Sequence, residues 1–230
     1  MKVWTESELE KISKSLEGKD PKEAIKWALD NFQPDVSLAC SFGAEDVALV
    51  DMLVKVNPKA RIFYLDTGLL FKETYELIDR VAEKYGIKPE KYSSAISVKD
   101  MEREYGPKLW EANPDRCCGI RKVVPLEDAL KGLKAWITGI RRDQAPTRAN
   151  APVVGWDAKF NLVKINPLVT WTWEDVWGYI RKNGVPYNVL HDKDYPSIGC
   201  EPCTKAVKPG EDPRAGRWAG KGKTECGLHK

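Results

Sequence analysis

Short apolar segments alternate with longer amphipathic segments, and this alternation constrains the possible folds of the chain most strongly. Four apolar runs have the length and composition of buried strands: 36–40, 61–65, 135–138 and 162–165. The segments 45–55 and 71–85, which follow the first two runs, carry apolar residues at helical spacing. Strands that alternate with helices predict a three-layer α/β/α fold with a mostly parallel sheet.

Helix boundaries support the same fold class. Residues 5–33 predict two helices, and the second begins where a proline follows the capping residue Asp20. A later helix is expected over 173–183, with Thr172 as its N-terminal cap and Gly184 as its stop.

Composition argues against nucleic-acid-binding, membrane-spanning and secreted proteins. The 230 residues contain 37 basic and 34 acidic side chains, and a net charge of +3 is too small to predict nucleic-acid binding. No apolar run approaches the roughly 18 residues of a membrane span, and the N-terminus shows no signal segment, so a cytoplasmic protein is expected. We expect one α/β domain over 1–203 and a mobile, basic, glycine-rich arm over 204–230.

The turn after the first strand has the features of an anion site. In a parallel sheet, ligands bind at the carboxyl ends of the strands. Ser41 offers a hydroxyl, Gly43 permits a close backbone approach, and the following helix presents its N-terminus. The motif is neither a Walker A loop nor a G-x-G-x-x-G loop. An ordinary strand-to-helix turn is the alternative.

The six cysteines fall into distinct groups. Cys117 and Cys118 are adjacent, and Cys200 and Cys203 form a second pair. Four thiolates suit an iron–sulfur cluster or a structural zinc, and adjacent ligands suit a cluster better. A disulfide or unconnected thiols stay open as alternatives. Cys40 lies within a predicted strand and is expected to be a buried core thiol.

Cys226 stands apart from the other cysteines. It lies on the glycine-flanked basic arm, where cationic neighbours favour the nucleophilic thiolate. His229 could add positive charge nearby. An accidental surface thiol is the alternative interpretation.

Several motifs occur together over residues 35–230 in a fixed order. They are Ser41–Asp46, Leu65–Gly68, Cys117-Cys118 with Lys122, Thr138–Gln144, Cys200-x-x-Cys203, Arg214–Trp218 and Glu225–His229. With these motifs the chain resembles the assimilatory adenylyl-sulfate (APS) and phosphoadenylyl-sulfate (PAPS) reductases. These enzymes are members of the adenine nucleotide alpha hydrolase-like (PP-loop) superfamily.

The resemblance implies a function and a cofactor. It implies thioredoxin-dependent reduction of APS to sulfite and AMP, in sulfate assimilation and cysteine biosynthesis, with glutaredoxin as another possible reductant. It also implies a [4Fe–4S] cluster on Cys117, Cys118, Cys200 and Cys203. Because both cysteine pairs are present, APS is favoured, and PAPS is the alternative substrate. The oligomeric state is open, with a homo-oligomer allowed.

The resemblance also implies roles for individual residues. The catalytic set is Cys226, Lys122, Arg214 and Arg217. The substrate-binding set is Ser41, Phe42, Gly43, Glu45, Leu65, Asp66, Gly139, Arg141, Arg142, Arg148 and His229. The cations would neutralise the substrate so that Cys226 can attack the sulfate sulfur and form an S-sulfocysteine.

Two other classes of protein compete with this interpretation. A PP-loop ATP pyrophosphatase of the tRNA-thiolation type carries S-G-G-x-D-S, and the segment Ser41–Asp46 departs from that pattern. A zinc-stapled binding module would use the four cysteines without any catalysis.

Overall fold

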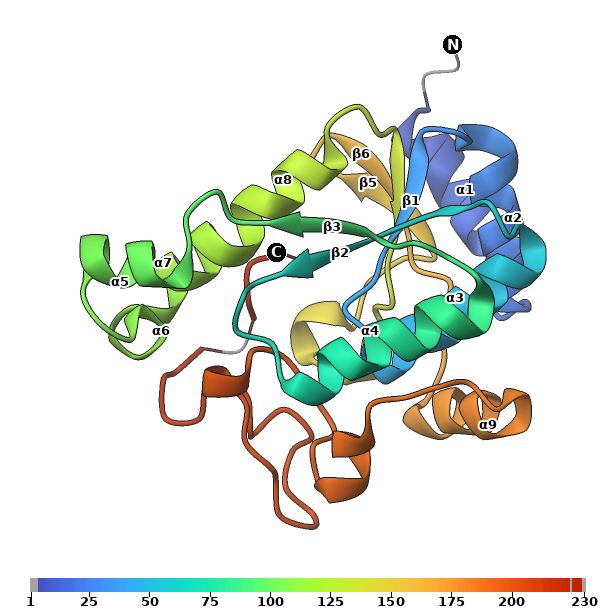
Figure 1. Cartoon of the computed structure of the whole chain (residues 1–230). Helices are drawn as coiled ribbons and strands as arrows, with labels where there is room; N and C mark the ends of the chain where they lie inside the picture. The colour runs from blue at the N-terminus through green and yellow to red at the C-terminus, as the bar shows by residue number, and fades with distance from the viewer. Residues whose placement is uncertain (1–3, 224, 229–230) are drawn as a thin grey trace.

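A six-stranded sheet forms the centre of the molecule in the computed structural model, which describes residues 4–223 and 225–228 (Figure 1). The spatial order is β3-β2-β1-β4-β6-β5. The strands are β1 (Val36–Ala39), β2 (Arg61–Asp66), β3 (Glu90–Ser93), β4 (Ala135–Ile137), β5 (Val154–Asp157) and β6 (Leu162–Ile165). Only β5 pairs in the antiparallel sense, so the predicted mostly parallel sheet is confirmed.

Nine α-helices lie within the described residues. They are α1 (Glu6–Leu16), α2 (Pro21–Phe32), α3 (Ala44–Val56), α4 (Lys72–Tyr85), α5 (Val98–Tyr105), α6 (Leu109–Ala112), α7 (Pro114–Cys118), α8 (Val124–Leu130) and α9 (Trp173–Asn183). A π-helical turn, Gly119–Val123, joins α7 to α8. The predicted start of α2 after Asp20 and the ends of α9 at Thr172 and Gly184 are confirmed.

Helices cover both faces of the sheet because side chains alternate along each strand. Phe63 and Trp136 face α8 and pack in one buried cluster with Leu126. Their strand neighbours Ile62 and Ile137 belong to the larger core, which is completed by α2, α3, α4 and α9. The result is the predicted three-layer arrangement. No helix of the described residues is long and apolar enough to cross a membrane.

The two edge strands were missed from the sequence. Exposed and half-buried residues alternate along β3, whose sequence Glu90–Ser93 is polar, and β5 contains a glycine and an exposed tryptophan. An edge strand has a neighbouring strand on one side only and is less buried than a central strand, so it often lacks the apolar run that marks a central strand.

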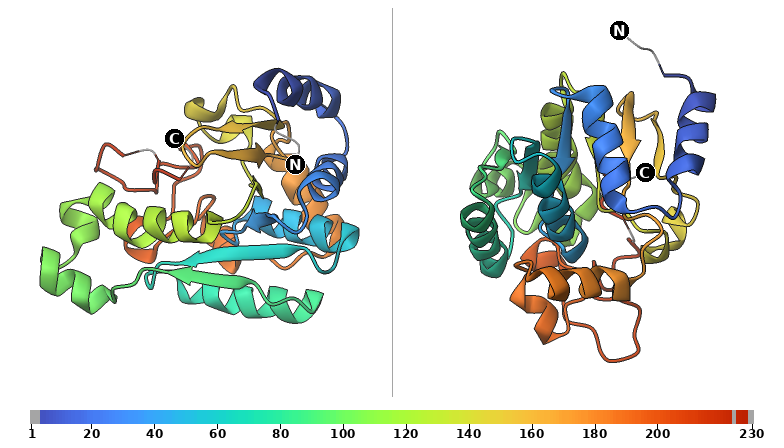
Figure 2. Two further views of the ribbon diagram at one scale, coloured as in Figure 1. Left: turned by 90° about the horizontal axis from the view of Figure 1, so that it is seen from above. Right: turned by 90° about the vertical axis from the view of Figure 1, so that its right-hand side faces the viewer.

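The last part of the chain lies against the carboxyl edge of the parallel strands. Figures 1 and 2 show this segment, in red, running past the ends of β2 and β3 and alongside α8. Trp218 is buried within it, and Leu228 packs against the α8 cluster. The short helices α5, α6 and α7 project beyond the same edge.

Candidate active site

A cavity of about 530 Å³ opens where β1, β2 and β4 end. Many of the predicted site residues line it, although they come from distant parts of the chain. They are Ser41, Phe42, Gly43, Glu45, Leu65, Lys122, Gly139, Arg141, Arg148, Arg214, Arg217 and Cys226. The fold therefore brings together residues that only the motif order had connected.

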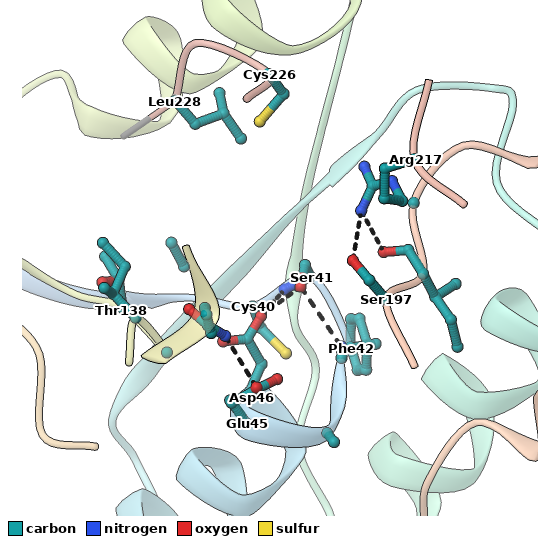
Figure 3. A pocket seen from close by; sticks show the side chains of 18 of the residues that line it. Cys40, Ser41, Phe42, Glu45, Asp46, Thr138, Ser197, Arg217, Cys226 and Leu228 are labelled. Carbon is teal, nitrogen blue, oxygen red and sulfur yellow. Dashed lines mark hydrogen bonds between the residues drawn. The ribbon is translucent and has the colours of Figure 1, made fainter. Parts of the chain in front are cut away.

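The loop after β1 forms the floor of this cavity. The backbone N–H of Ser41 donates to the Asp46 carboxylate at 2.6 Å, and the Ser41 hydroxyl donates to the same oxygen at 2.5 Å (Figure 3). Phe42 adopts a left-handed conformation with φ of 59° and is buried. The Ser41 hydroxyl that was expected to meet an anion is thus already bonded inside the loop.

Within the protein itself, the tightest backbone packing of this loop lies at Gly139 rather than at Gly43. A Cβ atom on Gly43 would make ordinary contacts, the nearest at 3.5 Å from the Ser41 hydroxyl. A Cβ atom on Gly139 would lie 2.2 Å from an Asp46 carboxylate oxygen. The end of β4 therefore packs directly on the start of α3. Burial raises the pKa of Asp46 to about 6, against the hydrogen bonds from Ser41.

Glu45 and Arg141 form a second fixed part of the floor. The Arg141 Nε donates to the Glu45 carboxylate at 2.9 Å, and the Gln144 side chain donates to the same oxygen at 2.9 Å. Arg141 is buried and also pairs with Asp143. Its positive charge is therefore neutralised by the protein itself.

Cys226 lies on the opposite side of the cavity. Figure 3 shows its sulfur pointing into the space above Ser41 and Asp46, with Leu228 beside it. The preceding residue, Glu225, is buried and forms ion pairs with Arg148 at 2.9 Å and Arg214 at 3.4 Å. Cys226 itself is half-buried. The C-terminal segment thus forms a roof over the floor built by β1, β4 and α3.

Lys122 and Arg217 differ from the other cations of the cavity. Among the described residues, neither pairs with a carboxylate. The Arg217 guanidinium donates to the Ser197 hydroxyl at 3.2 Å and the Ile198 carbonyl at 3.3 Å, and its Nε is buried without a partner. Burial lowers the pKa of Lys122, but the electrostatic interactions with the neighbouring side chains of Cys200 and Cys226 outweigh this effect and raise the pKa overall. Two positive groups are therefore available to an anionic ligand.

A second, small cavity holds the four paired cysteines. Cys117, Cys118, Cys200 and Cys203 all line it, and Lys122 and Trp218 line both cavities. The Thr67 hydroxyl lies 3.3 Å from the Cys200 sulfur. Among the described residues, no three cysteine, histidine or acidic side chains form a group that could hold a single metal ion.

The chemistry of these four thiols favours a sulfur-binding cation. Burial and the neighbouring thiols raise the pKa of Cys117 to about 12, and burial raises that of Cys203 to about 11. Such thiols lose their protons readily only to a metal, which binds the thiolate form. The set therefore fits a cofactor that offers separate metal corners to separate sulfurs.

Two predicted site residues do not line the large cavity. Arg142 pairs with Glu17 and donates to the Ala151 carbonyl at 2.9 Å, which joins the loop after β4 to α1. The Asp66 carboxylate accepts hydrogen bonds from Tyr75 and the Gly68 backbone. His229 lies outside the described residues.

Other residues of the cavity had no individual signal in the sequence. His191 lines the cavity beside Trp173, and both of its ring nitrogens are buried without a hydrogen-bond partner. Burial lowers its pKa, so the ring is neutral near pH 7. Glu225 was noticed only as part of a motif. Its bidentate partner, Arg148, is 77 residues away in the sequence, so no local pattern could reveal that Glu225 is buried.

The comparisons with known proteins agree with this geometry. Residues 35–206 match the family described as phosphoadenosine phosphosulfate reductase domain. The chain is 46% identical over 228 residues to the adenosine 5'-phosphosulfate reductase of a Geobacillus species, covering 99% of this chain and 97% of the relative. It is 50% identical over 212 residues to the adenosine 5'-phosphosulfate reductase 2 of Bacillus subtilis, covering 92% and 90%.

A solved structure is also similar. The phosphoadenylyl-sulfate reductase of Candida auris, crystallised with phosphate, superposes with a TM-score of 0.79 at 31% identity, covering 90% of this chain and 99% of that one. The family model spans most of the chain, and the relatives match it almost end to end. The chain therefore belongs to the phosphoadenosine phosphosulfate reductase family.

Proposed function

We propose that this protein reduces APS to sulfite and AMP in sulfate assimilation, on the way to cysteine. The observation that carries the proposal is the Cys226 thiol, which points into a cavity also lined by Lys122 and Arg217, two cations with no carboxylate partner in the part of the chain that the structure describes. Relatives that match nearly the whole chain are named adenosine 5'-phosphosulfate reductase, which favours APS over PAPS.

The first step is the attack of Cys226 on the sulfate sulfur. APS carries one negative charge on its phosphate and one on its sulfate, and a thiolate approaches such a group only when these charges are compensated. Lys122 and Arg217 supply this compensation at the cavity wall. The new bond joins the Cys226 sulfur to the substrate sulfur. The bond from that sulfur to the phosphate oxygen breaks, and AMP leaves with the electron pair.

The second step needs an external dithiol. One thiolate of thioredoxin, or of glutaredoxin, attacks the Cys226 sulfur and expels sulfite with the bonding electrons. The second thiol then resolves the mixed disulfide, so the reductant is oxidised and Cys226 returns as a thiol. The arm 204–230 has to leave the cavity to meet this partner. Reduced dithiols of this kind are typical of the cytoplasm, where we place the protein.

The four paired cysteines would hold a [4Fe–4S] cluster. When bound, the cluster would link α7, which carries Cys117 and Cys118, to the segment around Cys200 and Cys203, and it would influence the electric field near Lys122. Iron and acid-labile sulfide analysis tests this assignment. Cys203→Ser should lose iron while Cys40→Ser keeps it, because Cys40 lies on the cavity floor away from the four cysteines.

Steady-state turnover with thioredoxin tests the activity. We expect sulfite and AMP in equal amounts from APS, and a higher kcat/KM for APS than for PAPS. A preference for PAPS would establish the alternative substrate with the same chemistry. Release of pyrophosphate from ATP without sulfite would replace the proposal by the ATP pyrophosphatase class.

A further inference from the structure

The residue before the nucleophile is more deeply buried than the nucleophile itself. Glu225 is 5% exposed, although it lies near the end of the chain. Arg148 donates to its two carboxylate oxygens at 3.0 and 2.9 Å, which is a bidentate pair, and Arg214 reaches it at 3.4 Å. A bidentate arginine–carboxylate pair fixes orientation as well as position.

The residues after the nucleophile are held as well. The Lys159 side chain donates to the Gly227 carbonyl at 2.6 Å, and Leu228 packs against the α8 cluster. Gly227 has φ of 87°, a conformation that favours glycine. Cys226 is therefore held on both sides in the sequence. The ion pairs of Glu225 hold the residue before it, and the hydrogen bond to the Gly227 carbonyl and the packing of Leu228 hold the residues after it.

Four cations that line the cavity fall into two groups. Arg148 and Arg214 share the single carboxylate of Glu225, which leaves one net positive charge, whereas Lys122 and Arg217 have no carboxylate partner among the described residues. The two negative charges of APS match the second pair without displacing Glu225. Substrate and docked tail can then occupy the cavity together, which an attack by Cys226 requires.

From this arrangement, and resting on the proposed function, we infer that Glu225 is the positioning residue of the nucleophile. Its carboxylate docks the tail between Arg148 and Arg214, so these two arginines serve to dock the tail. Loss of the carboxylate removes the buried negative charge that Arg148 and Arg214 share, which disfavours the docked tail.

Glu225→Gln and Glu225→Asp test the inference, with Glu211→Gln as the matched control. Glu211 lies on the same C-terminal segment but is exposed. Three quantities are measured on the purified holoprotein: the affinity for AMP, the rate at which APS alone sulfonates Cys226, and the rate at which iodoacetamide alkylates Cys226. Peptide mass analysis of the tail separates Cys226 from the other cysteines.

For Glu225→Gln we expect sulfonation to slow about 10- to 100-fold, because a buried charge pair is broken, while AMP affinity changes by less than about 2-fold. Alkylation should become about 10-fold faster, since the tail opens more often. Glu225→Asp keeps the charge and should recover part of the sulfonation rate. Glu211→Gln should match the unmodified protein in all three measurements.

Two results would overturn the inference. Tighter nucleotide binding with unchanged or faster sulfonation in Glu225→Gln would show that Glu225 competes with substrate for the arginines. Equal alkylation rates in Glu225→Gln and the unmodified protein would show that the carboxylate does not hold the tail. Absence of sulfonation in the unmodified protein would instead contradict the proposed function, and the alkylation rates would still decide the docking.

Discussion

Glu45 and Glu225 both form ion pairs with arginines that line the same cavity. Glu45 belongs to a helix of the central scaffold, whereas Glu225 belongs to the C-terminal segment. Glu45 lies in the first turn of α3 and holds Arg141, which follows β4. Glu225 lies close to the chain end and holds Arg148 and Arg214. The first pair joins two elements of the sheet scaffold, whereas the second joins a terminal segment to it.

On the proposed function, the floor stays in place during the reaction, whereas the roof has to leave the cavity. Opening the floor would disrupt the packing of β1 and β4 against α3, which includes many fully buried side chains. Opening the roof at residues 225–228 breaks the ion pairs of Glu225, the hydrogen bond from the Lys159 side chain to the Gly227 carbonyl, and the packing of Leu228. A nucleophile that must meet first a small substrate and then a protein reductant needs a roof of this kind.

The strongest test of the comparison replaces each of the two thiols that line the cavity by serine in turn. Cys226→Ser should lower sulfite formation at least about 10³-fold, because a serine hydroxyl is not ionised near pH 7 and is a poor nucleophile. Cys40→Ser changes a floor thiol that faces the same cavity and should keep most of the activity. The check is sulfite release with AMP affinity as the control for folding. Retained turnover in Cys226→Ser would show that the roof does not supply the nucleophile.

A second test concerns the cation between the two cavities. Lys122→Gln should lower kcat/KM for APS about 10²- to 10³-fold, because one of the two charges that oppose the substrate is lost. Lys131→Gln is the control, since Lys131 lies on the exposed end of α8 and pairs with Asp128. Similar kinetics for both variants would show that Lys122 does not face the substrate.

A third test compares the contributions of two adjacent arginines, Arg141 and Arg142, to the stability of the floor. Arg141→Gln leaves the Glu45 carboxylate without its buried partner and should reduce the free energy of unfolding by about 3 kcal/mol. Arg142→Gln breaks a half-exposed pair with Glu17 and should cost about 1 kcal/mol or less, with activity near that of the unmodified protein. Urea denaturation measures both. Equal losses would contradict the assignment of Arg141 to the floor.

The smallest effect is the pH dependence of the floor loop. The folded protein holds the Asp46 proton more tightly than the unfolded chain, with a pKa of about 6 against 3.8. The contribution of Asp46 to stability is therefore largest at low pH and falls as the pH rises through about 4 to 6. The Asp46→Asn variant has no carboxyl group to titrate at this position, so it does not lose stability in this way. The free energy of unfolding of the variant minus that of the unmodified protein should therefore rise by about 1 kcal/mol from pH 5 to pH 8. A difference that does not change with pH would contradict a raised pKa.

The central strands and the long helices were predictable because each carries its own signal. The apolar run at 36–40 and the cap at Thr172 specify structure within a few residues. The edge strand β3 and the π-helical turn at Gly119–Val123 carry no comparable local pattern. Their conformations depend on neighbours supplied by the rest of the fold.

Most of the residues that line the cavity could be named from the sequence, but their arrangement in space could not. The motif order named Arg141 and Arg142 together, and only the structure separates the one that lines the cavity from the one that pairs with α1. Arg148 and Glu225 are 77 residues apart, so their ion pair follows from the path of the chain rather than from spacing. The roof is consequently the part that sequence reasoning described least well.

The central claim is that Cys226 attacks the sulfur of the nucleotide sulfate from the roof of the cavity. The most direct measurement mixes the protein with APS in the absence of any reductant and follows AMP release together with the mass of the tail peptide. The account predicts one AMP released for each Cys226 that gains one SO₃ group, and no SO₃ on Cys40. AMP release without a modified Cys226, or modification of another cysteine instead, would contradict it.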